Sequence, residues 1–459
     1  MKKVKKIIVW FRQDLRLHDN EALAEAYKRA EEVIPVYVFD ERQFSGKTTY
    51  GFAKTAKYRA KFIIEAVQDL KNSFQAKGID LIVRRGKPEE EVFKLVEELK
   101  TSWVFANMER TAEEVEVQNA LEKNLWTIGK ELQFFRGKML YYTQDLPFPI
   151  THAPDIFKLF RKELERFVMV REPLAEPSEF KPFSEKIEVG DLPKIEDFGH
   201  QPFEVDGRSV LDFRGGETAG LERLKYYLWD SDCVQQYENT RNGLLGADYS
   251  SKLSPWLALG CISPKHVYWE LKAYEQKRKK NKSTYALFLE LLWRDFFRLM
   301  GKKHGNKIFL KGGILERERK ELNEDLAIFE QWATGQTGIP FIDANMLELN
   351  KTGFMSNRGR QNVASYLVND LGINWQIGAE YFESLLVDYD VCSNWCNWNY
   401  IARVGTDPRD ERYFNPLTQA KRYDPKGDYA KCWLPHLNGI PAEEIHEKSS
   451  RNDRNLQAH

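Results

Sequence analysis

The chain has 459 residues, too many for one ordinary hydrophobic core, so we expect two domains. Its 69 basic and 69 acidic residues balance, so overall charge gives no support to nucleic-acid binding, and any such site must be a local patch. No apolar run approaches the roughly 20 residues of a membrane span, and the Lys-rich start is typical of strand flanking rather than of a signal peptide, so we expect a cytoplasmic protein without membrane contact.

Residues 1–135 alternate short β-branched runs with amphipathic helical segments. The runs are KKIIVWF, EVIPVYVFD, IDLIVRRG, SWVFANM and ELQFFRG. Between two of them, residues 88–100 have apolar positions at helical spacing and an acidic first turn. This alternation predicts an α/β domain with a doubly wound, Rossmann-like parallel sheet. No GxGxxG follows the first run, so we do not expect a pyrophosphate site at that turn.

The rest of the chain divides by composition. Residues 136–210 are expected to be an interdomain linker, because prolines interrupt every longer pattern between 173 and 202. Residues 211–440 have a helical pattern and predict a larger all-α domain. Residues 441–459 are polar and are expected to form a flexible tail. Five cysteines, an odd number, argue against disulfide bonds, and Cys392 and Cys396 are expected to be buried free thiols rather than metal ligands.

A hydroxyl-rich loop precedes the first helices of the all-α region, in YSSKLSPWLALG from Tyr249. Three hydroxyls and Lys252 lie within the five residues that end at Ser254, and a helix is predicted from Pro255. Hydroxyls, backbone N–H groups and a cation at a helix start suit a diphosphate. The alternative is an ordinary Ser-Pro helix start without a ligand.

The segment ELLWRDFFR places Glu290, Trp293, Arg294 and Phe297 on one helical face. One interpretation is an amphipathic helix with an internal Glu–Arg pair. The other is an indole that stacks on an extrahelical base, beside a carboxyl that hydrogen-bonds the same base after burial raises its pKa.

Further along the chain, Asp390, Asn394 and Trp398 have the spacing i, i+4, i+8. On a helix this spacing puts a carboxylate, an amide and an indole in one row. A flat, polar, conjugated ligand such as a flavin suits this face. For any single Trp, the alternative is ordinary core packing.

The motifs SNRGRQNVASYL and DYDVCSNW around these residues resemble the photolyase/cryptochrome family, in particular the DASH-type cryptochromes. The resemblance extends from IVWFRQDLRLHDN near the start to YFNPLTQAKRYDP and WLPHL near the end, and so covers almost the whole chain. It implies one FAD per chain, active as FADH⁻, in the all-α domain, and an antenna in the α/β domain. The implied activity is blue-light repair of cyclobutane pyrimidine dimers. The two closely spaced cysteines do not resemble the iron–sulfur branch of the family.

The resemblance assigns roles residue by residue. Arg360 would pair with Asp388 beside the flavin, and Asn394 would face flavin N5, where a neutral amide suits FADH⁻. Trp293 and Glu290 would hold the lesion, with Asn357 between flavin and lesion. The full set implied for FAD is Tyr237, Ser250, Ser251, Lys252, Leu253, Ser254, Arg294, Arg360, Asp388, Asp390 and Asn394.

Trp398 and Trp375 match the first two members of the family's electron-relay triad. The third position falls on Leu322, ten residues before Trp332, where relatives carry the exit Trp. A neighbouring Tyr or Trp must therefore substitute, or photoreduction must slow.

Tyr400 stands where duplex-active photolyases carry Trp, so it would stack less strongly on a flipped lesion. Flipping out of a duplex costs a few kcal/mol, which single strands avoid, so we expect single-stranded DNA with pyrimidine dimers to be the preferred substrate. The residues expected to contact phosphates are Arg358, Arg403, Arg409, Arg412 and Lys421, with scattered solvated charges as the alternative.

The segment ANMERTAEEVEVQ resembles the folate-side segment of the family, with Glu109 and Glu113 as contacts of a 5,10-methenyltetrahydrofolate antenna. An acidic helix N-terminus is the alternative explanation for the same residues. For the whole protein, the alternative to repair is a blue-light receptor that signals through a partner. We expect a monomer.

Overall fold

A computed structural model describes residues 4–183, 187–319, 321–407 and 412–446. The N-terminal part contains a five-stranded sheet in the order β3-β2-β1-β4-β5, and every neighbouring pair of strands is parallel. The strands are β1 (Val4–Phe11), β2 (Ala30–Asp40), β3 (Ile82–Gly86), β4 (Trp103–Asn107) and β5 (Glu131–Phe135). The predicted doubly wound α/β domain is confirmed.

Helices cover both faces of this sheet, because alternate side chains of each strand point to opposite faces. Ile7 and Val9 of β1 pack with α1 (Glu21–Arg29) and α3 (Lys57–Ala76), whereas Ile8 and its neighbours pack with α4 (Pro88–Leu99) and α5 (Ala112–Thr127). Both faces are buried, which explains the nearly continuous apolar runs in the sequence.

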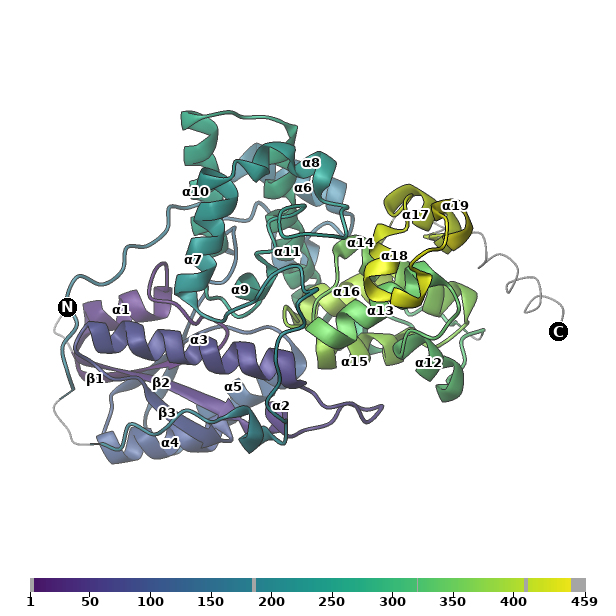
Figure 1. Ribbon diagram of the computed structural model, residues 1–459. Helices are drawn as coiled ribbons and strands as arrows, with labels where there is room; N and C mark the ends of the chain where they lie inside the picture. The colour runs from purple at the N-terminus through teal and green to yellow at the C-terminus, as the bar shows by residue number, and fades with distance from the viewer. Residues whose placement is uncertain (1–3, 184–186, 320, 408–411, 447–459) are drawn as a thin grey trace.

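The second domain is helical, as predicted, and in Figure 1 its first helices lie above the sheet while the later ones extend to the right. The remaining α-helices are α2 (Glu41–Phe44), α6 (Phe157–Phe167), α7 (Glu217–Lys225), α8 (Tyr237–Thr240), α9 (Ser254–Ala258), α10 (Pro264–Lys277), α11 (Lys282–His304), α12 (Leu326–Ala333), α13 (Pro340–Thr352), α14 (Asn357–Ser365), α15 (Trp375–Leu385), α16 (Val391–Ile401), α17 (Pro416–Tyr423), α18 (Asp428–Trp433) and α19 (Ala442–Ile445). Short 3₁₀ helices span Ile150–His152, Ile195–Phe198, Cys233–Gln236, Gly305–Phe309 and Pro435–Leu437, and π-helical turns span Tyr226–Asp230 and Tyr366–Asp370.

The segment expected to be a linker carries structure of its own. Helix α6 lies within it and packs against α11, where the rings of Phe160 and Phe296 are 5.2 Å apart. In the segment expected to be a flexible tail, α19 is formed and Ile445 is buried, and residues 447–459 lie outside the described residues.

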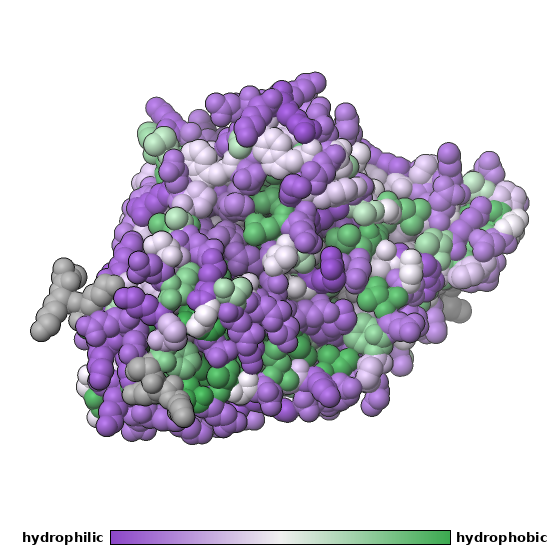
Figure 2. Space-filling view, turned by 60° about the vertical axis from the view of Figure 1, so that its left-hand side comes forward, coloured by the Kyte–Doolittle hydropathy of each residue, from purple (hydrophilic) through white to green (hydrophobic). Residues whose placement is uncertain are grey.

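The surface and the cysteines agree with the composition. Figure 2 shows a largely hydrophilic face on which apolar residues gather only in separate areas. Within the described ranges, no helix is long and apolar enough to cross a membrane. All five cysteines are free thiols, and Cys392 and Cys396 are buried, as expected.

Candidate functional site

A pocket opens between α14, α15 and α16 in the helical domain. It encloses about 610 Å³ of empty space, counting the part that is open to solvent. Its walls combine carboxylates, an amide and an indole, the set of groups that the sequence predicts for a flavin. The sequence-predicted residues that line it are Asn357, Arg360, Asp388, Asp390, Asn394, Trp398 and Arg412.

The start of α16 fixes the row of side chains along the pocket. Asp390 caps this helix by accepting a hydrogen bond of 2.8 Å from the backbone N–H of Ser393. One and two turns later, Asn394 and Trp398 lie on the same face. Asn394 donates to the backbone carbonyl of Ala379 at 3.0 Å, which holds its amide in the wall. The helical spacing predicted from the sequence is therefore present.

Helices α15 and α16 approach each other closely behind the indole. A Cβ atom added to Gly378 would lie 2.3 Å from Cη2 of Trp398, so only glycine fits at this point of α15. Phe382, one turn further on, meets the same indole edge-on with ring centroids 5.2 Å apart. Trp398 is thereby held rigidly, with 2% of its surface exposed.

The Asp388 carboxylate offers an open hydrogen-bond acceptor to a ligand. Its Oδ2 accepts from Arg360 at 2.9 Å and from the Ser254 hydroxyl at 2.6 Å. Its Oδ1 is buried in the pocket wall and has no hydrogen-bond partner among the residues that the structure describes. An unpaired buried oxygen costs about 1–3 kcal/mol unless a donor reaches it. A ligand with N–H or O–H donors, such as a flavin with its ribityl hydroxyls, fits this position.

A buried ionic chain connects this pocket with the α/β domain. Arg298 donates to Asp390 at 3.0 Å and to Glu109 at 3.1 Å, and Glu109 also pairs with Lys138. Burial alone would raise the pKa of each carboxyl, but these cations hold the pKa values of Asp390 and Glu109 below their usual range. Both carboxylates therefore stay ionised, and a negative charge borders the pocket.

The hydroxyl-rich loop contributes less to the pocket than its sequence suggests. Lys252 is buried, donates to the carbonyl of Ala247 at 2.9 Å and lies 3.2 Å from the ring centre of Tyr249. Burial lowers the pKa of Lys252 to about 7. Ser254 is the loop residue that joins the site, through Asp388.

Other residues expected to contact FAD do not line the pocket. Arg294 donates to the carbonyls of Lys138 and Leu257, at 2.9 and 3.2 Å, and its buried Nε has no partner in the described part of the chain. Tyr237 is buried at the start of α8, where burial raises its pKa. The remaining members of this set that are absent from the wall are Ser250, Ser251 and Leu253.

An aromatic cluster extends from the pocket to α11. Arg412 lines the pocket and lies 5.4 Å from the ring centre of Tyr400, which meets Trp293 edge-on at 6.2 Å. Phe157 of α6 stacks on one face of Trp293 with centroids 3.7 Å apart and planes 10° apart. Trp293 is only partly buried, so the helix face predicted to hold a base remains within reach of solvent.

Glu290 has a partner that sequence reasoning missed. Arg241 donates to its carboxylate, and the Glu290 side chain keeps 37% of its surface exposed. Partial burial raises the pKa of Glu290 above its usual value, and Arg241 opposes this rise. The direction favours a carboxyl that can hold a proton beside a ligand. Arg241 lies 49 residues away along the chain, so no local pattern could have shown this pair.

A larger cleft lies between the two domains, where the carboxyl ends of the strands face the helical domain. It encloses about 2130 Å³ of empty space, counting the open part. Glu109 and Glu113, the predicted antenna contacts, both line it. Glu109 is buried in its ion pairs, whereas Glu113 is exposed and pairs with Lys54.

The two predicted relay tryptophans occupy neighbouring helices. Trp398 lies on α16, and Trp375 begins α15 and donates to the carbonyl of Lys311 at 3.0 Å. Leu322, at the third position, is buried with 5% of its surface exposed. An aliphatic side chain cannot accept the positive charge that the predicted relay would carry outward.

The basic residues expected to contact DNA differ in their surroundings. Arg358 donates to Asn242 at 2.8 Å, and Arg403 donates to Asn369 at 3.2 Å. Arg412 pairs with Asp407, and Lys421 lies exposed on α17. Arg409 falls outside the described residues. Metal binding has no support in the described ranges, which contain no group of three or more His, Cys, Asp or Glu side chains placed to hold an ion.

Comparison with known proteins agrees with this geometry. Residues 7–178 match DNA photolyase, and residues 287–459 match the FAD binding domain of DNA photolyase. The chain is 49% identical to a cryptochrome DASH of Gloeobacter violaceus over 443 residues, which cover 96% of this chain and 88% of the relative.

Solved structures give the same result in three dimensions. A Synechocystis cryptochrome superposes with a TM-score of 0.93 at 49% identity, covering 97% of this chain and 92% of that one. An archaeal photolyase from Sulfolobus tokodaii, solved with two FAD molecules, superposes with a TM-score of 0.79 at 28% identity, covering 96% and 93%.

Proposed function

Because the chain belongs to the photolyase/cryptochrome family and is similar to its DASH cryptochromes, we propose that it repairs cyclobutane pyrimidine dimers under blue light, with a preference for single-stranded DNA. The observation that carries the proposal is the continuous series of contacts from the pocket to the lesion-side helix. Arg412 at the pocket touches Tyr400, Tyr400 touches Trp293, and Glu290 lies one turn before Trp293 on α11.

The pocket residues support FAD as the cofactor. When bound, FADH⁻ excited by light supplies one electron to the lesion and recovers it after the dimer has split. Asp388 would accept a hydrogen bond from the cofactor at Oδ1, while its Oδ2 is held by Arg360 at 2.9 Å. Asn394 would offer a neutral amide to the flavin ring, with its NH₂ group anchored to the carbonyl of Ala379.

On the lesion side, Glu290 is placed to hydrogen-bond a base carbonyl, and the raised pKa of its carboxyl favours the protonated form that can donate this bond. This bond stabilises the negative charge that the dimer carries after it has accepted an electron. Arg241 keeps the carboxyl in place and adds positive charge to the same region. Trp293, with Phe157 behind one face, forms a rigid wall against the dimer, and Asn357 stands at the pocket rim between cofactor and lesion.

The preference for single strands follows from the size of the stacking wall. Tyr400 presents a smaller ring than the Trp of duplex-active photolyases, and that ring is already engaged edge-on with Trp293 and Phe297. Aromatic stacking on a base is worth about 1–3 kcal/mol, which is comparable with the cost of flipping a base from a duplex. Weaker stacking on Tyr400 should therefore lower binding of duplex substrates, which must be flipped, more than binding of single strands.

The cleft between the domains is proposed to hold the antenna, 5,10-methenyltetrahydrofolate. Glu113 is placed to contact it, because it lines the cleft and is exposed. The role of Glu109 toward the folate is indirect, since its carboxylate is committed to Lys138 and Arg298. DNA phosphates would bind at Arg358, Arg403, Arg409, Arg412 and Lys421, and we propose that the protein acts as a cytoplasmic monomer.

Repair of a thymine dimer in a single-stranded oligonucleotide tests the proposal, with flavin-reduced protein in blue light and in the dark. We expect light-dependent loss of the dimer that falls by about ten- to a hundredfold in Glu290→Ala, because a hydrogen bond to a charged group contributes about 1.5–3 kcal/mol. Glu330→Ala, on the exposed side of α12, serves as the matched control and should repair as the wild type does. Equal repair by both variants would contradict the role of Glu290.

A further inference from the structure

The predicted chain of electron carriers between the protein surface and the flavin pocket is interrupted at Leu322. Other aromatic side chains offer a second connection between the pocket and the surface. The ring of Trp375 contacts that of Trp395, edge-on, with centroids 5.8 Å apart. Trp395 lies on α16, three residues before Trp398, and 5% of its surface is exposed. Trp375 and Trp398 therefore both have this third indole as a neighbour.

Trp395 in turn is hydrogen-bonded to a tyrosine. Its indole N–H donates to the hydroxyl of Tyr389 at 3.3 Å, and this hydroxyl donates to Oε2 of Glu383 at 2.7 Å. The Arg59 guanidinium lies 4.6 Å from the ring centre of Tyr389. A tyrosine loses an electron readily only if its phenolic proton can leave at the same time, and the Glu383 carboxylate is the acceptor for that proton.

This series of side chains reaches a solvent-exposed surface. Trp395, Tyr389 and Glu383 all line the cleft between the domains, and Tyr389 also lines the flavin pocket. Trp395 is buried, but Tyr389 and Glu383 are partly exposed. A small reductant in the cleft can therefore reach the phenol of Tyr389. Leu322 is not part of this series of contacts.

We propose that Trp395 and Tyr389 replace the missing exit tryptophan, with Glu383 as the proton acceptor. The oxidised end of the relay, Tyr389, is then reduced from the interdomain cleft. One electron leaves Trp398 for the bound flavin, and Trp375 and Trp395 pass one electron inward in turn. Tyr389 then gives one electron to Trp395 and its phenolic proton to Glu383. A thiol in solution restores Tyr389 by donating a hydrogen atom, pairs of the resulting thiyl radicals couple to a disulfide, and Glu383 returns its proton to solvent.

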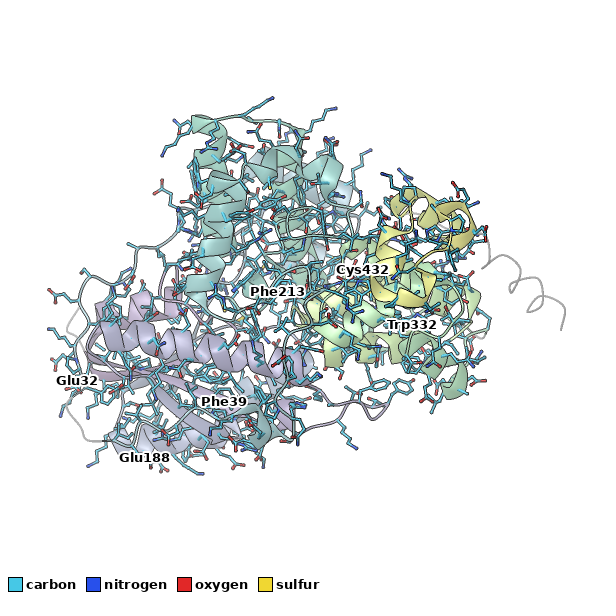
Figure 3. The ribbon with its side chains drawn as sticks, viewed as in Figure 1. Glu32, Phe39, Glu188, Phe213, Trp332 and Cys432 are labelled. Atoms are coloured by element: carbon cyan, nitrogen blue, oxygen red, sulfur yellow. The ribbon has the colours of Figure 1, made fainter. Side chains whose placement is uncertain are left out.

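A second aromatic route leads away from Trp398 through Phe382. Phe382 lies between Trp398 and Trp332, with centroid distances of 5.2 and 6.3 Å, and Tyr381 meets Trp332 at 6.0 Å. Trp332 is fully buried, and Figure 3 shows it in the helical domain, far from Phe39 of the sheet. A phenylalanine ring is much harder to oxidise than an indole or a phenol, so this route carries a barrier that the first one lacks.

The test rests on the proposed function only because it requires bound flavin. The absorption spectrum of the flavin shows whether each variant has bound it. Oxidised protein with a dithiol is illuminated with blue light, and transient absorption follows tryptophanyl and tyrosyl radicals. The wild type should form a neutral tyrosyl radical. Trp395→Phe and Tyr389→Phe should lose this radical and most of the photoreduction, and Glu383→Gln should delay it. Tyr381→Phe, on the alternative route, should match the wild type.

The outcomes separate the two proposals. A wild-type protein that binds no flavin would contradict the proposed function. Flavin-loaded Trp395→Phe that is photoreduced at the wild-type rate would overturn the exit route while leaving repair intact. Loss of the tyrosyl radical in Tyr381→Phe would assign the exit to Trp332 instead. If Trp395→Phe fails to fold, Tyr389→Phe and Glu383→Gln, which preserve the ring packing, decide the matter.

Discussion

Glu109 and Glu113 line the same cleft and have the same chemistry, but the structure gives them opposite surroundings. We predict that Glu109→Gln destabilises the protein strongly and that Glu113→Gln does not. Glu109 is 2% exposed and holds Lys138 and Arg298 between the two domains. Glu113 has a 60% exposed side chain whose partner is Lys54. The pair of variants thus compares a buried carboxylate that has two cationic partners with an exposed one that has a single cationic partner, with the chemical change held constant.

The expected magnitudes follow from these contacts. Removing one partner of a buried ion pair costs about 3–5 kcal/mol, because the remaining charge stays out of water. Lys138 limits this loss, because burial already lowers its pKa to about 8 and it can release its proton when Glu109 is neutral. We therefore expect a loss of about 3 kcal/mol for Glu109→Gln. The exposed Glu113–Lys54 pair should contribute no more than about 1 kcal/mol.

Urea unfolding of the folate-free protein measures both changes, and titration with methenyltetrahydrofolate measures the affinity of each variant. The expected result is a large loss of unfolding free energy in Glu109→Gln, and a weaker affinity with unchanged stability in Glu113→Gln. Equal unfolding free energies in the two variants would refute the reasoning from burial. So would a Glu109→Gln protein of wild-type stability that had lost folate binding.

Three further predictions concern the helical domain. Asp388→Asn removes the charge that Arg360 faces and should weaken FAD binding by about tenfold or more, measured by equilibrium dialysis. Burial raises the pKa of Glu348 to about 8, so the folded state keeps a proton that the unfolded state releases near pH 4.5. The free energy of unfolding should therefore fall as pH rises from about 4.5 toward 8. Glu348→Gln, still accepting from Tyr429, should remove this part of the pH dependence; identical slopes in urea unfolding between about pH 5 and 8 would contradict it. Tyr400→Trp should raise repair of duplex dimers relative to single strands, and an unchanged ratio would rule out the stacking argument.

The fold could be predicted from the sequence because its signals are local. The central strands β1 and β2 are apolar runs that are buried on both faces, and α4 begins with a proline and an acidic turn, so length and periodicity were sufficient. The row Asp390, Asn394 and Trp398 was predictable for the same reason, because helical spacing alone places these residues together.

The remaining features depend on contacts between distant segments. Arg241 pairs with Glu290, which is 49 residues away along the chain. Arg298 pairs with Glu109, 189 residues away, and with Asp390, 92 residues away. No spacing rule could show these pairs, although Arg298 lies on the same face of α11 as Glu290 and Arg294 at helical spacing. The orientation of a long side chain is equally hidden, as Lys252 turns to Ala247 and away from the pocket.

The most direct test of the account compares one thymine dimer in a single strand and in the matching duplex, under the same blue light and in the dark, with flavin bound and reduced. We predict that the dimer disappears only in light and faster from the single strand, since that substrate avoids the cost of base flipping. An unchanged dimer in illuminated single strands would contradict repair and would favour a light receptor in its place.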